Sequence, residues 1–225
     1  MLSGLPEYVI HMVEAQPEMT GKWEGPSWSK VAARDIDHYR PESSPHRPVT
    51  RFKLQYDRRG LYGIFKVKDR FVRCIHTDYQ SDVFKDSCVE IFLQPKVGQG
   101  YFNFEFNCGG ALLAYHILDP SRSNGKFRDY VVLSGETDSL IKRFHSTPVT
   151  VDPEHLKPMD WYLEFFIPFS VMENHVGPIN REEVWRGNLF KCGDETSQPH
   201  WGAWSPVDEL DFHRPANFGH LYFTS

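Results

Sequence analysis

The stretch CVEIFLQPKVGQGYFNFEFNC, residues 88–108, decides the fold class because it has the pattern of two β-strands joined by a tight turn. Aromatic and β-branched side chains dominate both flanks, and the central PKVGQG carries one Pro and two Gly, which favour a hairpin turn. In the simplest antiparallel register, Gln94 pairs with Tyr101. Since side chains alternate along a strand, this hairpin has two distinct faces.

One face of the predicted hairpin is purely apolar. In the chosen register it carries six side chains, namely Val89, Ile91, Leu93, Phe102, Phe104 and Phe106. A sheet face of this kind has to be covered, and a second packed sheet is the usual cover.

The opposite face is polar and places Glu90 directly across from Glu105. Like charges in that position destabilise a sheet by about 0.2–1 kcal/mol, and a one-residue slip would turn the apolar set to the wrong side. We therefore expect an offsetting Lys or Arg, a shared proton, a bound cation or the hydroxyls of a ligand. The alternative is an ordinary solvated face, or one salt-bridged through Lys66, Arg186 or Lys191.

Short alternating runs continue along the rest of the chain, separated by 16 Gly and 16 Pro. This pattern predicts an all-β fold with little helix: an antiparallel β-sandwich of immunoglobulin-like or jelly-roll type. No stretch has the composition of a flexible linker, so residues 1–225 are expected to form one domain. A short helical turn within IPFSVMENH (167–175) and one or two further strands within 119–150 complete the prediction. The main strands are expected at 51–57, 60–69, 88–94, 100–108, 112–118, 161–169, 186–193 and 219–223.

Composition excludes several classes of function. Aromatics at 15% and charged residues at 24% indicate a globular chain, and the net charge of −5 argues against nucleic acid as a partner. No apolar run is long enough to span a membrane, and the first 20 residues do not have the pattern of a signal peptide. Four cysteines lack CxxC spacing, which argues against a zinc site and predicts buried free thiols. They are Cys74, Cys88, Cys108 and Cys192.

Paired carboxylates also suggest a glycoside-cleaving enzyme that uses Glu90 and Glu105. No GxSxG, HExxH, P-loop or dinucleotide-binding motif supports catalysis, and the eleven His are scattered. Enzyme activity therefore stays the minority interpretation, with no catalytic residue assigned. A sandwich that only mediates protein contacts is a further alternative.

Carbohydrate binding fits the polar face better. Aromatic rings cover the apolar faces of a pyranose, while carboxylates and amides bond its hydroxyls. Glu90, Glu105, Asn103 and Asn107 share one face, and the aromatic tail of residues 201–223 can border it. We expect a mono- or oligosaccharide ligand.

Five sequence blocks resemble the family 9 carbohydrate-binding modules, within the DOMON-like β-sandwich superfamily, over nearly the whole chain. The most specific are the D-x-x-VEIF block and the closing W-x-P…P-x-x-FG-x-L block. The blocks are GKWEGPSW (21–28), QYDRRGLYGIFKVKD (55–69), FKDSCVEIFLQP (84–95), YFNFEFNCGG (101–110) and WSPV to FHRPANFGHLYF (204–223).

The resemblance implies a β-sandwich that holds a sugar between two aromatic rings. Phe84, just before D-x-x-VEIF, and Phe212, three residues before Pro215, match the clamp positions, which are Trp in the xylanase-attached members. Glu90 matches the family's acidic contact, whereas Glu105 stands where those members carry a basic residue. Further candidates for the rim and the polar contacts are Asn107, Trp185, Arg186, Trp201, His213 and Arg214.

The resemblance also implies non-catalytic binding in polysaccharide metabolism, often beside glycoside hydrolases. It allows a structural calcium ion, although no EF-hand-like loop is present and no metal ligand can be assigned. Family resemblance favours export, while the missing signal peptide and unpaired thiols slightly favour the cytoplasm. The sequence does not define the oligomeric state.

Overall fold

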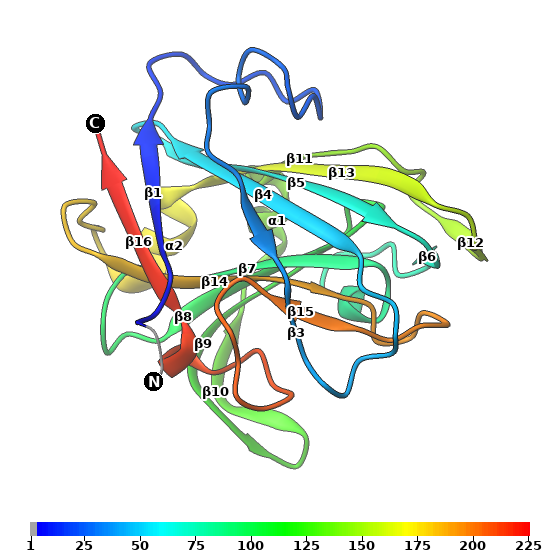
Figure 1. Ribbon diagram of the computed structural model, residues 1–225. Helices are drawn as coiled ribbons and strands as arrows, with labels where there is room; N and C mark the ends of the chain where they lie inside the picture. The colour runs from blue at the N-terminus through cyan, green and yellow to red at the C-terminus, as the bar shows by residue number, and fades with distance from the viewer. Residues whose placement is uncertain (1–3) are drawn as a thin grey trace.

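Residues 4–225 are described by a computed structural model, in which one long twisted sheet folds over itself into two packed layers (Figure 1). The first layer has the spatial order β10 (Lys126–Val132), β9 (Leu112–Ser123), β8 (Tyr101–Asn107), β7 (Cys88–Gln94), β14 (Trp185–Cys192) and β16 (Gly219–Thr224). The second has the order β4 (Val49–Tyr56), β5 (Gly60–Asp69), β13 (Met159–Pro168) and β11 (Lys142–His145). β1 (Glu7–Met12) joins the layers because it pairs with both β16 and β4.

Shorter elements complete the architecture. β15 (Trp201–Ala203) pairs with β14 and β3 (His38–Tyr39), β2 (Arg34–Ile36) pairs with β4, and β6 (Val72–Cys74) pairs with β12 (Val151–His155). The helical segments are α1 (Gly135–Leu140), α2 (Phe169–Val176) and the 3-10 turns η1 (Val83–Lys85) and η2 (Pro215–Asn217). Within residues 4–225 no helix is long and apolar enough to cross a membrane.

The predicted hairpin is confirmed in both register and facing. β7 and β8 pair with Glu90 opposite Glu105 and Ile91 opposite Phe104. The turn depends on Gly100, whose φ is +71° and where an added Cβ would lie 2.2 Å from the Ile117 carbonyl oxygen. All six side chains of the apolar face are fully buried in the core between the layers.

The prediction of an antiparallel β-sandwich with little helix is confirmed, with one local difference. All eight expected strands are present within two residues of their predicted starts, and the helical turn after β13 is α2. β1 differs because it is parallel to both of its neighbours. Of the C-terminal aromatics, Trp204 and Phe218 are buried, and the partly buried Phe223 packs against the core.

The second, polar face of β7 and β8 is covered rather than open to solvent. The β9–β10 hairpin projects beyond the layer, and the chain between β14 and β16 carries a loop beside it (Figure 1). A separate hydrophobic cluster forms beneath these segments, built on Phe92, Tyr101, Phe190, Phe212 and Phe218. The candidate functional site lies in this region.

Candidate functional site

A cavity of about 590 Å³ lies between the polar face of the first layer and the segments that cover it. Its volume falls within the range of about 300–1,000 Å³ usual for small-ligand sites. The strands contribute Glu90, Glu105, Leu113, Tyr115 and Cys192. The β9–β10 hairpin contributes Arg122, Gly125, Lys126, Phe127 and Tyr130. The remaining lining residues are Asp82, Phe84, Asp194, Trp201, Leu210, Asp211, Phe212 and His213.

Two carboxylates lie side by side on the strand wall of the cavity. Glu90 and Glu105 are 3% and 4% exposed, and both line the cavity. Asn103 Nδ2 donates a hydrogen bond of 2.6 Å to Glu105 Oε1, and the Cys192 thiol donates one of 3.1 Å to Glu90 Oε1. Glu105 Oε2 is buried and has no hydrogen-bond partner among the described residues.

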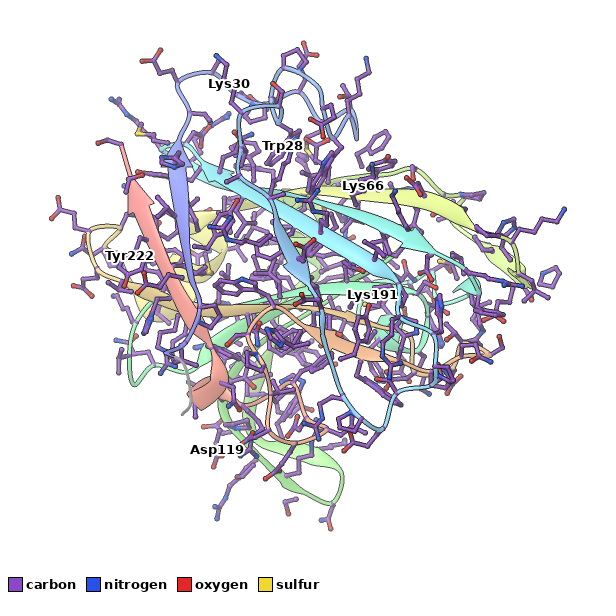
Figure 2. All side chains as sticks on the ribbon, viewed as in Figure 1. Trp28, Lys30, Lys66, Asp119, Lys191 and Tyr222 are labelled. Carbon is purple, nitrogen blue, oxygen red and sulfur yellow. The ribbon has the colours of Figure 1, made fainter. Side chains whose placement is uncertain are left out.

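The three cations suggested by the sequence do not neutralise this carboxylate pair. Lys66 Nζ lies 3.8 Å from Asp160, and Arg186 donates to the Ala216 and Phe218 carbonyl oxygens. Lys191 points to the other side of β14, where its Nζ lies 3.5 Å from Asp69 (Figure 2 labels Lys191).

The carboxylates instead retain protons more strongly than usual. Burial raises the pKa of Glu105 to about 8. Burial, with the neighbouring Cys192 and Glu105, raises the pKa of Glu90 well above its ordinary value. Protonated carboxyls both donate and accept hydrogen bonds, so this wall can pair with ligand hydroxyls in either direction.

The two aromatic side chains at the clamp positions both line the cavity. Phe84 lies in η1 and is half-buried. Phe212 stacks on Phe190 with ring centroids 4.0 Å apart and an interplanar angle of 14°, and is 9% exposed. One face of the Phe212 ring is therefore occupied by the protein itself.

Two further predicted residues, Trp201 and His213, also line the cavity. Trp201 Nε1 donates a 2.8 Å hydrogen bond to Asp194, a carboxyl whose pKa burial raises to about 6. His213 packs edge-on against Phe127 at 4.5 Å. Burial, reinforced by the charge of Arg122, lowers the pKa of His213 to about 3, so the imidazole is neutral at physiological pH.

The other four predicted residues do not line the cavity. Asn107 accepts from the Ala111 amide and donates to the His76 carbonyl, which fixes the chain around the β8–β9 turn. Trp185 lies fully buried in the core between the layers. Arg186 holds the chain leading into β16, and Arg214 pairs with Asp208 and Glu209.

The β9–β10 hairpin contributes site residues that the sequence analysis did not identify. Tyr115 and Tyr130 lie 5.4 Å apart between ring centroids, and the Arg122 guanidinium lies 4.5 Å from the centre of the Phe127 ring. The segment KFRDYVV carries two of these aromatics, but only the position of the hairpin shows that they face the cavity.

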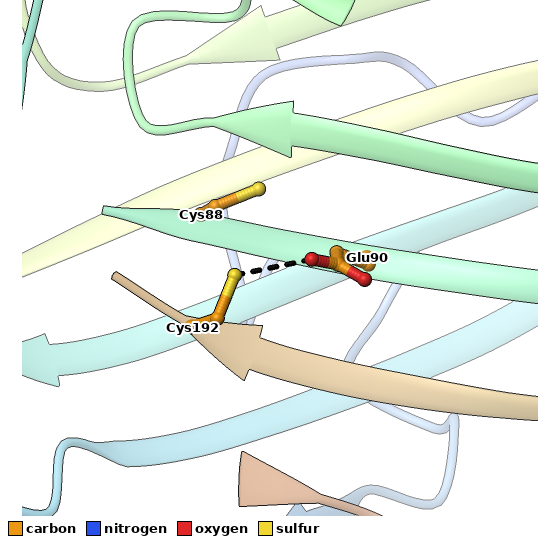
Figure 3. A group of neighbouring side chains, drawn as sticks. All are labelled: Cys88, Glu90 and Cys192. Carbon is orange, nitrogen blue, oxygen red and sulfur yellow. Dashed lines mark hydrogen bonds between the residues drawn. The ribbon is translucent and has the colours of Figure 1, made fainter. Parts of the chain in front are cut away.

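One group of side chains could hold a metal ion: Cys88, Glu90 and Cys192 (Figure 3). Within residues 4–225, it is the only group of three or more His, Cys, Asp or Glu side chains with ligand atoms close enough together. Calcium takes six to eight oxygen ligands, whereas two of these three atoms are sulfur. The group therefore does not fit the calcium ion that the family resemblance allowed.

The fold is a β-sandwich with a cavity lined by aromatic rings and buried carboxyls. Sequence comparison specifies the family: the profile of carbohydrate-binding family 9 matches residues 27–223, so the chain belongs to that family. Its function is non-catalytic carbohydrate binding. No curated protein matches the chain.

Solved structures show the same architecture. A candidate carbohydrate-binding protein from Bacteroides uniformis is 27% identical, with a TM-score of 0.83 over 98% of this chain and 100% of that one. A family 9 module from Caldicellulosiruptor kristjanssonii in complex with cellotriose is 13% identical, with a TM-score of 0.64 over 97% and 93% of the two chains. A family 9 module from the same organism in complex with glucose is 15% identical, with a TM-score of 0.59 over 96% of each chain.

Proposed function

We propose that the cavity between the β7–β8 face and the β9–β10 hairpin is the carbohydrate site of this protein. The observation that supports this assignment is the composition of the cavity wall. Phe84, Phe212 and Trp201 stand around Glu90 and Glu105, so apolar platforms and hydroxyl partners meet in one space. A pyranose needs both, because its ring faces are apolar and its edge carries hydroxyls.

In this proposal Phe84 is the principal stacking ring. Its side chain is more exposed than that of Phe212, which already uses one ring face against Phe190. Tyr115, Phe127 and Tyr130 add aromatic surface from the hairpin. This additional surface compensates for phenyl groups at positions where xylanase-attached relatives carry the larger indole.

Glu90 and Glu105 are proposed to bond the hydroxyls at the edge of the sugar ring. The free Glu105 Oε2 is available for a ligand without breaking a bond within the protein. The carboxyls are unsuited to glycoside cleavage, because they stand side by side on one wall, whereas a glycosidase places its two acids on either side of the scissile bond. Four other candidates do not contact the sugar in this proposal and only stabilise the structure around the site. They are Asn107, Trp185, Arg186 and Arg214.

The proposed ligand is a neutral mono- or oligosaccharide, with binding that serves polysaccharide metabolism. Glucose and cellotriose, the ligands in the two Caldicellulosiruptor complexes, are the first compounds to test.

Isothermal titration calorimetry with these sugars, followed by a wider glycan array, tests the assignment. Phe84→Ala is expected to abolish measurable binding. Tyr222→Ala is the matched control, because Tyr222 lies on β16 and does not line the cavity (Figure 2). A reducing-sugar assay on every compound that binds is expected to show no turnover. Equal affinity in wild type and Phe84→Ala would refute the site, and turnover lost in Glu90→Gln would refute simple binding.

A further inference from the structure

Two cysteines far apart in the sequence meet on the carboxylate wall of the cavity. Cys88 on β7 and Cys192 on β14 are directly paired in the antiparallel ladder, so their side chains leave the sheet on the same face. Glu90 follows Cys88 by two residues and shares that face. One ligand atom from each of the three lies within 4.8 Å of the others, and Cys192 Sγ approaches Glu90 Oε1 to 3.1 Å (Figure 3).

From this geometry we infer that Cys88, Cys192 and Glu90 form a binding site for a thiophilic divalent cation of the zinc class. In a tetrahedral zinc site, neighbouring sulfur and oxygen ligands lie roughly 3.6–3.8 Å apart. The three ligand atoms lie within 4.8 Å of one another, so small side-chain movements would bring them to tetrahedral spacing. The cysteines lack CxxC spacing along the sequence, which argued against zinc. Pairing of β7 with β14, rather than a CxxC turn, brings the two thiols together.

A second observation points to the same site. Glu105 pairs directly with Glu90 across β7 and β8, and its buried Oε2 has no hydrogen-bond partner among residues 4–225. Glu105 is not among the side chains whose ligand atoms lie close together, so this oxygen is suited to accept a hydrogen bond from a water on the metal rather than to bind the metal itself. A divalent cation would also offset the repulsion between the two carboxylates, which Lys66, Arg186 and Lys191 do not neutralise.

The ligand set selects the class of metal. Thiolates favour zinc and other soft or borderline ions, whereas magnesium and calcium require oxygen. An entry path exists because Cys192 and Glu90 both line the cavity. The site goes beyond carbohydrate binding and shares Glu90 with the proposed sugar contacts.

The test uses the full chain, stripped of metal by a chelator and kept reduced with a phosphine. Co²⁺ is then added as a spectroscopic probe, and Zn²⁺ affinity is measured by competition with a chromogenic chelator. One equivalent of Co²⁺ is expected to give an intense thiolate-to-cobalt charge-transfer band that Zn²⁺ abolishes and Ca²⁺ does not. Cys192→Ser and Glu90→Gln are expected to weaken Zn²⁺ binding by about 100-fold or more, beyond the usual effect of losing an outer-shell partner.

Cys74→Ser is the matched control, because Cys74 is equally buried but lies in the core between the layers. It is expected to retain the charge-transfer band, with circular dichroism confirming the fold of each variant. The wild-type cobalt spectrum is decisive even if a cysteine variant fails to fold. Absence of the band in wild type, or its persistence in folded Cys192→Ser, would overturn the inference. A Cys88–Cys192 disulfide in the purified protein, with no metal bound after reduction, would overturn it equally.

Discussion

Glu90 and Glu105 face each other in direct register across β7 and β8, both nearly sealed from solvent except at the cavity. Such a pair costs stability in the free protein, since burial and like charge both oppose ionisation. The chain therefore keeps an unfavourable feature at the place where a ligand would relieve it. Strained or destabilising arrangements are often found at functional sites.

Glu105→Gln keeps the shape of the side chain and removes one ionisable group, so it is expected to raise the free energy of unfolding by about 1 kcal/mol. Urea unfolding at pH 7 in the presence of a chelator measures the change without metal. Glu18→Gln is the control, because Glu18 is exposed and forms no salt bridge with any residue of 4–225. A less stable Glu105→Gln protein would show that the carboxylate pair is not a cost to the fold.

Local patterning in residues 88–108 was sufficient to predict the hairpin, its register and the carboxylate pair. The polar face was correctly identified, and the cavity beside it contains Glu90, Glu105, Phe84 and Phe212. The hairpin aromatics and the Cys88–Cys192 pairing were not predictable in the same way. They depend on which distant segments cover the face and on β7 pairing with β14, and both are tertiary choices that alternation along one strand does not specify.

Phe212 and Phe84 are expected to differ in their contribution to stability. Phe212 stacks on Phe190 and is nearly buried, so Phe212→Ala is expected to lower the free energy of unfolding by about 3 kcal/mol. Phe84 is more exposed, and Phe84→Ala is expected to cost about 1 kcal/mol. Denaturant unfolding of both variants gives the comparison. Equal losses would mean that Phe84 is as much a packing residue as Phe212.

Arg122 on the β9–β10 hairpin is expected to contribute to sugar affinity but not to folding. Its guanidinium lies over Phe127 at the cavity, and its side chain is exposed. The guanidinium stands at the cavity as a donor to sugar hydroxyls. A hydrogen bond contributes about 0.5–1.5 kcal/mol net, so Arg122→Ala is expected to weaken sugar binding roughly 2–10-fold. Arg128→Ala is the matched control, since Arg128 is on the same hairpin but not in the cavity lining. A similar loss in both variants would assign the effect to the net charge of the hairpin.

Asp69 is a buried carboxylate on the other side of β14 from the cavity. His46 Nε2 lies 2.8 Å from Asp69 Oδ1, while Lys191 Nζ and Trp161 Nε1 lie 3.5 and 3.2 Å from Oδ2. Burial alone would raise the pKa of Asp69. The charge of Lys191 and the hydrogen bond from His46 outweigh that effect and hold this pKa well below its ordinary value.

Asp69 therefore binds protons more weakly in the folded chain than in the unfolded chain, whose aspartate pKa is about 3.9. Its contribution to stability is complete above that pH and is lost as the pH falls through it toward the lower folded-state pKa. Urea unfolding between pH 7 and pH 2.5 is expected to show this loss in wild type. Asp69→Asn is expected to be less stable by about 3–5 kcal/mol at pH 7, because it leaves Lys191 buried without its partner.

Asp69→Asn is also expected to lose less stability than wild type between pH 5 and pH 2.5, since the group that titrates is gone. Asp160→Asn is the control, because Asp160 is exposed and its Oδ2 forms a long ion pair of 3.8 Å with Lys66 Nζ. Exposed pairs contribute about 0–1 kcal/mol, so this variant should follow the wild-type pH profile closely. If Asp69→Asn and wild type lost stability in parallel, the acid sensitivity of the fold would have to originate from other carboxylates.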